Sequence, residues 1–321
     1  MAVVIISTGG TIASKSSDTE EGVSPSLEAS DLIESVPQLD GLTEIRTDDF
    51  ANIPSPQITI EEMYALSQRV QEYAEDPDIE GIVVTHGTDT LEETSYFVDL
   101  CYDGEPPVVF TGAMRHPSQT SPDGPANLLA SVRAALSENA VGEGVFVAFN
   151  DRVHAARDVM KVNSLFLDAF RTPEFGPLAT IDEERVVWHR EPTTTDPTFD
   201  PSPEALTNQV YAYTTPADMA PEQIELGDPE AVCLAATGAG HIPPTIIEPL
   251  EALDADDVPI VVTTRCHESR LVRNTYSFRG SEATLRELGV QISDLPLSKT
   301  RIKTIVALAA GRLDDAFESL E

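Results

Sequence analysis

Four short runs of consecutive apolar residues constrain the fold of this chain more than any other feature. They cover Val3–Ser7, Gly81–Thr85, Pro107–Thr111 and Val145–Phe149. Stretches with apolar residues at helical spacing separate them, at Ile60–Tyr73, Leu91–Leu100 and Ala126–Leu136. Such runs are typical of strands buried on both faces, and strands that alternate with helices predict a parallel sheet. We therefore expect an α/β fold whose mostly parallel sheet is flanked by helices.

A proline-rich segment, Glu191–Pro203 (EPTTTDPTFDPSP), interrupts this alternation. Its four prolines among threonines and aspartates exclude a helix or an interior strand, so we interpret it as a linker. Beyond it we expect strands at Gln209–Thr214, Ala231–Ala235 and Pro259–Thr263, and a final helix from about Lys299 to Arg312. The predicted organisation is a larger N-terminal α/β domain over residues 1–190, which carries the candidate catalytic loops, a linker over residues 191–206, and a smaller C-terminal α/β domain over residues 207–321.

The charge of the chain is strongly negative and evenly distributed. There are 20 lysines and arginines against 55 aspartates and glutamates, a formal net charge of −35, and only four of the basic residues are lysine. Such a surface repels itself at low ionic strength and is screened by salt. We expect a salt-rich cytoplasm, as in a halophilic microbe. We exclude nucleic acid as a ligand, because phosphates require a basic surface.

The sequence predicts neither a membrane protein nor a secreted one. Every apolar run is far shorter than the roughly 18–20 residues that a membrane-spanning helix needs. The apolar start lacks the basic segment of a signal peptide. Cys101, Cys233 and Cys266 are widely spaced, which indicates reduced thiols rather than a metal or redox motif. We expect a cytoplasmic protein.

The first predicted strand runs directly into Thr8-Gly9-Gly10-Thr11. Glycines after a parallel strand allow a tight turn that leaves backbone N–H groups pointing into the cleft beyond the sheet. The dinucleotide pattern GxGxxG and the phosphate-loop pattern GxxxxGK[ST] are both absent there. Two interpretations remain from composition alone: a plain turn at the strand end, or a loop that presents a hydroxyl nucleophile.

A second polar loop, THGTDTLEET at Thr85–Thr94, also follows a strand directly. Asp89 or Thr90 can cap the following helix, and one of the two glutamates after them can complete a capping box. That explanation accounts for one polar side chain but not for the whole cluster. Beside a helix N-terminus, Thr88 and Asp89 would offer a hydroxyl and a carboxylate to a small amino-acid ligand.

Lys161 lies in ARDVMKVNS, Ala156–Ser164, after the strand that ends at Phe149. Lysine can lose its proton when it is partly desolvated or beside other cations, whereas arginine cannot. A solvated surface lysine is the alternative, but lysine is scarce in this chain. A threonine hydroxyl is a poor nucleophile until a base removes its proton. Loops at one edge of the sheet would together supply a nucleophile, a second hydroxyl, a carboxylate and a lysine.

Four segments resemble the bacterial-type L-asparaginase family in sequence, order and spacing. They are STGGTIAS at Ser7–Ser14, THGTDTLEETSYFVDL at Thr85–Leu100, TGAMRHPSQTSPDGPANL at Thr111–Leu128 and NDRVHAARDVMKVNS at Asn150–Ser164. The resemblance covers essentially the whole chain. It implies an enzyme that hydrolyses L-asparagine to L-aspartate and ammonia without a metal or other cofactor.

The resemblance also implies roles for individual residues. Thr11 matches the family's nucleophile, which forms a covalent β-acyl intermediate. Thr88, Asp89 and Lys161 match a second catalytic triad, in which Asp89 also binds the α-amino group of the substrate. Ser55, in NIPSPQ, matches the serine that binds the α-carboxylate. The remaining substrate-binding positions are backbone amides at Gly10, Gly87 and Thr88 and a backbone carbonyl at Ala113.

The N-terminal half departs from the family at two places. Many members carry a tyrosine in the loop after the first motif, whereas Lys15–Ser30 contains none. Either another hydroxyl of that loop replaces it, or Lys161 activates Thr11 through Thr88. The candidate hydroxyls are Ser16, Ser24 and Ser26. Pro56 stands where some members have a glutamine that contacts the amino group.

The C-terminal half carries TGAGHIPP at Thr237–Pro244, with Ala239 and His241 in place of an asparagine-bearing loop of the family. The family completes each site with the C-terminal domain of a neighbouring subunit, so the resemblance implies a homodimer or homotetramer. Two other functions remain open: an asparaginase-like amidotransferase subunit that acts on glutamine, and a non-catalytic module that binds an amino acid. The complete set of catalytic positions favours the enzyme over the binding module.

Other polar residues have a structural explanation. We expect His86 to pack or to hydrogen-bond locally. Arg115 and Asp123 are expected to tie the TGAMRH and SPDGP loops together. Cys266 and His267 are neighbours, and neighbouring residues of a strand point to opposite faces, so we do not expect a Cys–His dyad.

Overall fold

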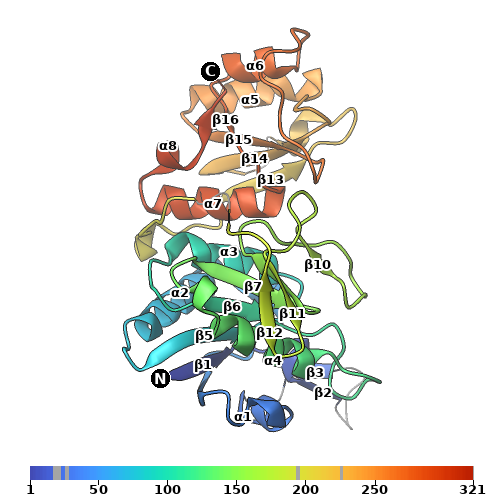
Figure 1. The fold of residues 1–321 in the computed structure, drawn as a ribbon. Coiled ribbons are helices and arrows are strands. Elements are labelled where there is room, and N and C mark those ends of the chain that lie inside the picture. The colour runs from blue at the N-terminus through green and yellow to red at the C-terminus, as the bar shows by residue number, and fades with distance from the viewer. Residues whose placement is uncertain (17–22, 26–28, 193–195, 225–226, 321) are drawn as a thin grey trace. The chain divides into compact units, whose positions relative to one another are not determined.

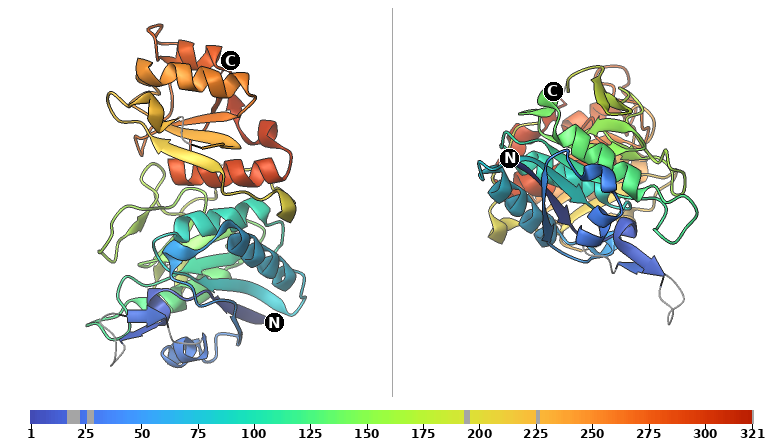
Figure 2. Two further views of the ribbon diagram at one scale, coloured as in Figure 1. Left: turned by 180° about the vertical axis from the view of Figure 1, so that it is seen from behind. Right: turned by 60° about the horizontal axis from the view of Figure 1, so that its bottom comes forward.

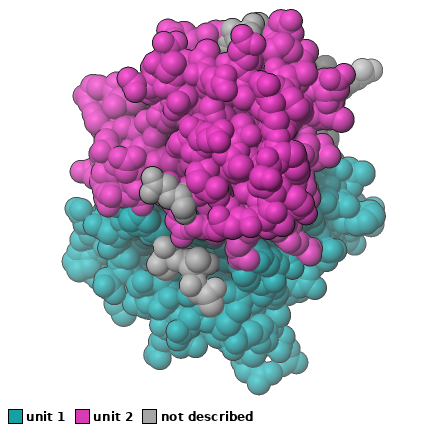
Figure 3. All heavy atoms as spheres, turned by 90° about the horizontal axis from the view of Figure 1, so that it is seen from above, with its two compact units in different colours: residues 1–198 teal, residues 199–321 magenta. Residues whose placement is uncertain are grey.

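The structure is a computed structural model that describes residues 1–16, 23–25, 29–192, 196–224 and 227–320. The chain divides into two units, Met1–Thr198 and Phe199–Glu321, which Figure 3 colours separately. The division therefore falls inside the proline-rich segment Glu191–Pro203.

Unit 1 (Met1–Thr198) is built on an eight-stranded sheet with strand order β12-β11-β8-β7-β6-β5-β1-β4 (Figure 1). Its parallel strands are β1 (Ala2–Ser7), β4 (Glu44–Asp49), β5 (Ile79–Thr85), β6 (Val108–Thr111) and β7 (Val145–Phe149). Beyond β7 the sheet continues with antiparallel strands β8 (Arg152–Ala155), β11 (Ala179–Asp182) and β12 (Arg185–Trp188). The predicted mostly parallel sheet, with strands at the apolar runs, is confirmed.

Helices cover both faces of this sheet (Figure 1, Figure 2). They are α2 (Ile60–Ala74), α3 (Leu91–Cys101) and α4 (Gly124–Ala135). Alternate residues of β1 point to opposite faces: Val4 and Ile6 join the buried cluster that contains α2 and α3 residues. Val3 and Ile5 join the cluster that contains α4 residues. Burying each such side chain contributes about 1.5–3 kcal/mol, so β1 is fixed from both sides.

Several smaller elements of unit 1 carry or border candidate site residues. They are α1 (Ala29–Glu34), the hairpin of β2 (Ser14–Ser16) with β3 (Val23–Pro25), and the hairpin of β9 (Met160–Lys161) with β10 (Phe170–Arg171). Single 3₁₀ turns occupy Thr11–Ala13 and Ser55–Gln57. Because β9 and β10 form a sheet of their own, Lys161 is not carried by the main sheet.

Unit 2 (Phe199–Glu321) is the smaller α/β domain, with strand order β13-β14-β15-β16-β17. Its strands are β13 (Val210–Thr214), β14 (Ala231–Ala236), β15 (Ile260–Thr264) and β16 (Gln291–Ile292), all parallel, and antiparallel β17 (Glu318–Ser319). Its helices are α5 (Ile247–Ala255), α6 (Glu282–Glu287), α7 (Leu297–Ala309) and α8 (Leu313–Ala316). Within the described part of the chain, no helix is long and apolar enough to cross a membrane.

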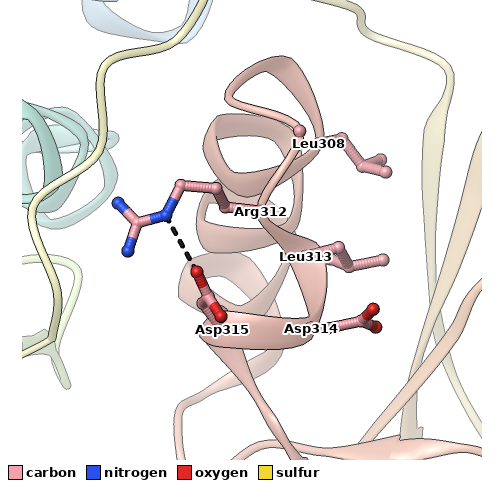
Figure 4. Close-up of a pocket in the computed structure, with 6 residues that line it drawn as sticks. Leu308, Arg312, Leu313, Asp314 and Asp315 are labelled. Carbon is pink, nitrogen blue, oxygen red and sulfur yellow. Dashed lines mark hydrogen bonds and ion pairs between the residues drawn. The ribbon is translucent and has the colours of Figure 1, made fainter.

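The helix expected from about Lys299 to Arg312 is present as α7, with different ends, and it is not the final helix. The observed α7 begins directly after Pro296 and stops before Gly311, whose φ of +64° belongs to the left-handed region that ends helices. The short helix α8 follows. Across this turn Arg312 Nε donates to Asp315 Oδ2 at 2.9 Å (Figure 4). The hollow beside it, of about 390 Å³, is lined by residues 308 and 311–315, none of which is an expected site residue.

Candidate active site

The register of the main sheet aligns the carboxyl ends of four parallel strands, so that the loops after them start at one level. Ser7, the last residue of β1, pairs with Thr85 at the end of β5, and Thr85 pairs with Thr111 at the end of β6. On its other side Ser7 pairs with Asp49 at the end of β4. The carboxyl ends of parallel strands are where open α/β sheets bind ligands. The loops after β1, β4, β5 and β6 therefore leave the sheet side by side.

The TGGT loop packs against the loop after β5. Gly9 and Gly10 have φ values of +101° and +87°, a conformation that L side chains rarely adopt. A Cβ added at Gly10 would lie 2.5 Å from Gly87 Cα, so the two backbones meet without room for a side chain. Thr8 donates both its backbone N–H and its hydroxyl to the Thr85 carbonyl, at 3.1 and 3.0 Å. This leaves Thr11 half-buried, directly after the turn.

The hydroxyls expected to replace the family's tyrosine are only partly covered by the structure. Ser26 lies outside the described residues. Ser16 and Ser24 belong to β2 and β3, for which the backbone alone is described. Their proposed role stays a prediction.

Ser55 joins the loop after β4 to the loop after β5. Its buried hydroxyl accepts a hydrogen bond from the backbone N–H of Asp89 at 3.3 Å, and its carbonyl accepts one from the Thr90 hydroxyl at 2.8 Å. A Cβ added at Gly87 would lie 2.5 Å from Ser55 Oγ. A side chain at position 87 would therefore clash with Ser55, and a side chain at position 10 would clash with Gly87. The structure brings Gly10, Ser55 and Gly87, three expected substrate-binding residues, together.

Lys161 reaches two of the expected triad residues at once. Its Nζ donates to Thr88 Oγ1 at 2.8 Å and to Asp89 Oδ1 at 2.6 Å. The Lys161 side chain is only 12% exposed, whereas that of Asp89 is 62% exposed and open to solvent. Thr88 is buried. The cluster thus holds a shielded amine against a buried hydroxyl and an exposed carboxylate, which a ligand in solvent can reach.

Asp123 organises the loop after β6. Its carboxylate accepts hydrogen bonds from the backbone N–H groups of Met114 at 3.0 Å and Arg115 at 2.8 Å. The Arg115 guanidinium donates to the carbonyl of Ser121 at 3.2 Å. The prediction that these residues tie the two loops together is confirmed. Ala113, just before them, is buried.

Ala113 also lies near the start of the nucleophile turn. A Cβ added at Gly124 would lie 2.8 Å from the Ile12 side chain and 3.5 Å from Ala113 Cβ. The loop after β6 therefore approaches the residue that follows Thr11.

His86 is a packed residue, as predicted. It is 1% exposed, and its Nδ1 lies 2.8 Å from the carbonyl of Gly87. Since a carbonyl only accepts, Nδ1 carries the proton. Burial lowers the pKa of the His86 imidazole to about 4, because the charged form is poorly solvated there. His86 is therefore neutral near pH 7 and supports the loop that carries Thr88.

Two residues at the start of α3 make contacts that the sequence interpretation missed. The helix-cap alternative is wrong for this loop, because Thr90 is the N-cap residue but its side chain makes no capping hydrogen bond. Its hydroxyl is bonded to Ser55 instead. Glu92 accepts a hydrogen bond from the backbone N–H of Lys161. The motif THGTDTLEET contains both residues, but helix-cap chemistry predicts the same residue types there.

In unit 2 the reason given against a Cys–His dyad is wrong. The strand β15 ends at Thr264, so Cys266 and His267 lie beyond it, exposed, and strand alternation does not apply to them. His241 is enclosed by aromatic rings, with its ring centroid 4.9 Å from those of Tyr276 and Phe278.

Two family models together span the chain. The model "Asparaginase, N-terminal" matches residues 2–194, and "Glutaminase/Asparaginase C-terminal domain" matches residues 209–320. The chain belongs to the asparaginase family. Within this family, the N-terminal match covers all the loops that carry the expected site residues.

Individual members of the asparaginase family agree over nearly the full length. The chain is 36% identical over 318 residues to the "Probable L-asparaginase" of Deinococcus radiodurans, covering 96% of this chain and 93% of that protein. It is 34% identical over 318 residues to the "Glutaminase-asparaginase" of Pseudomonas fluorescens biotype A, covering 95% and 86%. The crystal structure of a probable cytoplasmic L-asparaginase from Campylobacter jejuni superposes with a TM-score of 0.79 at 29% identity, covering 96% and 94% of the two chains.

Proposed function

We propose that this member of the asparaginase family hydrolyses L-asparagine to L-aspartate and ammonia through a covalent acyl-enzyme on Thr11. The observation that carries the proposal is the placement of the Lys161 amine within hydrogen-bond distance of both Thr88 Oγ1 and Asp89 Oδ1. This cluster lies at the carboxyl end of the parallel sheet, beside the glycine turn that presents Thr11. A pure binding module needs the carboxylate and Ser55, but not the lysine.

In the proposed complex, the zwitterionic end of the substrate fixes its position. Asp89, which is exposed, binds the α-ammonium group, and Ser55 binds the α-carboxylate. These two contacts orient the substrate with its side-chain amide toward Thr11.

In the first chemical step the Thr11 hydroxyl attacks the side-chain amide carbon. Its proton passes to the Lys161 amine through the Thr88 hydroxyl, or is relayed to the amide nitrogen by a hydroxyl of the loop 15–30 that gives up its own proton as it accepts that of Thr11. Backbone N–H groups of Gly10, Gly87 and Thr88 stabilise the negative charge on the amide oxygen, and the Ala113 carbonyl orients the amide nitrogen. The C–N bond breaks as the nitrogen takes up the proton that came from Thr11, and ammonia leaves. Water then attacks the acyl-threonine ester, and L-aspartate is released as Thr11 regains its proton.

Glutamine is the second candidate substrate, because the related Pseudomonas fluorescens protein is named a glutaminase-asparaginase. We further propose a homodimer or homotetramer in a salt-rich cytoplasm. The cytoplasmic location is supported by the name of the Campylobacter jejuni relative, and the salt by the net charge of −35.

The test is ammonia release from L-asparagine, with L-glutamine in parallel, by purified protein in about 2–3 M salt, where surface charges are screened. We expect release from asparagine, and its loss in Thr11→Ala with an unchanged circular dichroism spectrum. A folded wild-type protein that binds aspartate but releases no ammonia would overturn the enzyme in favour of a binding module. Release only after addition of a partner subunit would favour the amidotransferase.

A further inference from the structure

We propose that Glu92 is a positioning residue of this site: its carboxylate holds the backbone of Lys161 against α3 and thereby sets the amine between Thr88 and Asp89. The kinetic test of this inference rests on the proposed function. The role of Glu92 in fixing the position of Lys161 does not depend on which substrate the protein binds.

Lys161 needs such a contact because its strand is not part of the main sheet. The strand β9 has two residues, and among the residues that the structure describes it pairs with β10 alone. The hairpin beyond it turns outward, with Leu165 78% and Phe166 67% exposed. Val159 before the strand and Phe170 after it are buried in the core, so the base of the hairpin is anchored. Met160 and Lys161, the two residues that directly follow the first anchor, are only half-buried.

Glu92 supplies the contact from the helix that directly follows the loop with the partners of the lysine amine. It is the second residue of α3, four residues after Thr88 and three after Asp89. Its Oε2 accepts the backbone N–H of Lys161, while Thr88 and Asp89 accept hydrogen bonds from the amine. Residues 88–92 therefore contact Lys161 at its backbone N–H and at its side-chain amine. The amine can be displaced by a change of side-chain rotamer or by movement of the backbone, and the hydrogen bond to Glu92 restrains the backbone.

Glu92 does not stand at the capping-box position of α3, because Thr90 is the N-cap residue and the third helical residue is Glu93. The N-cap residue of α3 makes no side-chain capping bond, whereas Thr59 and Glu62 form a complete capping box in α2. A carboxylate in the first turn of a helix interacts favourably with the helix dipole. A hydrogen bond from an amide to an ionised carboxylate is roughly twice as strong as a neutral one.

The chain offers a matched control in Glu61. Glu61 is the second residue of α2, as Glu92 is of α3, so both interact with a helix dipole in the same way. Glu61 is exposed, and in the part of the chain that the structure describes its side-chain carboxylate has no hydrogen-bond or ion-pair partner. Replacing it tests the general effect of losing a first-turn carboxylate.

The kinetic experiment compares Glu92→Ala, Glu92→Gln and Glu61→Ala in asparagine hydrolysis. A displacement of about 1 Å at a catalytic group costs about 10²-fold, so we expect kcat to fall about 10²-fold in Glu92→Ala. Glu92→Gln keeps an oxygen that accepts the Lys161 N–H and should stay within about threefold of wild type, a small loss on that scale. Glu61→Ala should match wild type. A wild-type rate in Glu92→Ala, or an equal loss in both Glu92 variants, would overturn the proposal.

A double variant separates positioning from a general structural effect. If Glu92 acts through Lys161, adding Glu92→Ala to Lys161→Met should lower the residual rate no further. An additional loss equal to that of the single variant would contradict the proposal. If Glu92→Ala does not fold, Glu92→Asp replaces it, because the shorter side chain draws the carboxylate back. The expected loss is then about tenfold, and an unchanged kcat again overturns the proposal.

A labelling experiment keeps this inference separate from the proposed function. The chain has only four lysines, so the rate of reductive methylation of Lys161 can be read from one peptide by mass spectrometry. Glu92→Ala should methylate Lys161 several-fold faster than wild type, while Glu92→Gln and Glu61→Ala should not. If wild type releases no ammonia but this pattern is observed, the proposed function fails and the role of Glu92 stands. Equal methylation rates in all variants overturn the role itself.

Discussion

At the scale of single residues, the proposed mechanism depends most on whether Lys161 acts as a base or only as a positive charge. General-base catalysis contributes about 10²–10⁴-fold, so Lys161→Met should lower kcat by that factor. Lys161→Arg separates the two roles, because arginine keeps the charge and the donors but cannot lose its proton. We expect it to be as slow as Lys161→Met in steady-state ammonia release. A rate near that of wild type in Lys161→Arg would show that charge alone is needed.

His86 gives a prediction about stability and pH. In the folded protein its pKa is lowered to about 4 by burial, whereas in the unfolded chain it is about 6.5. As pH falls below 6.5 the unfolded chain takes up a proton that the folded protein does not, so stability decreases until about pH 4. The full effect is about 3 kcal/mol. Urea unfolding between pH 7.5 and 4 should give a shallower pH dependence for His86→Gln than for wild type. Parallel curves for the two proteins would show that His86 does not contribute.

At the scale of elements, the contact between the loops after β1 and β5 depends on backbone approach. Gly10→Ala combines a left-handed φ of +87° with a Cβ placed 2.5 Å from the backbone of Gly87. Gly41 is the matched control, because its φ is +89° but nothing lies within 4 Å of an added Cβ. Gly41→Ala should cost about 1–2 kcal/mol from backbone conformation alone. Gly10→Ala should cost more and abolish ammonia release. Equal free energies of unfolding in the two variants would refute the close approach.

The elements that could be predicted from the sequence are those whose pattern is local. Strands β1, β5, β6 and β7 are buried on both faces and therefore read as continuous apolar runs. The edge strand β4 has the sequence EIRTDD, with no buried residue, so its pairing with β1 leaves no such signal. The polar loops could be located because each follows a parallel strand. The hydrogen bond between Glu92 and Lys161 could not, since it joins residues 69 positions apart.

At the scale of the whole molecule, lysines outside the candidate site are shielded from solvent as Lys161 is. Lys299 and Lys303, both on α7, are buried, with exposed fractions of 0% and 5%. The Lys161 side chain is 12% exposed. The three lysines whose side chains the structure describes are thus shielded, in both units, and the scarcity of lysine alone does not identify a catalytic residue. The geometry around Lys161 is what distinguishes it.

The net charge of −35 predicts that stability depends on screening. The Debye length falls from about 10 Å at 0.1 M to about 3 Å at 1 M salt, so repulsion between acidic side chains weakens over this range. The free energy of unfolding, measured with urea, should rise steeply between about 0.1 and 1 M potassium chloride, and ammonia release should rise with it. Sucrose at matched osmolality is the control, because it favours the compact state without screening charge. Full stability and activity in dilute buffer would refute the salt-rich setting and leave the enzymatic proposal intact. An equal gain in sucrose would assign the effect to solvent exclusion rather than to charge.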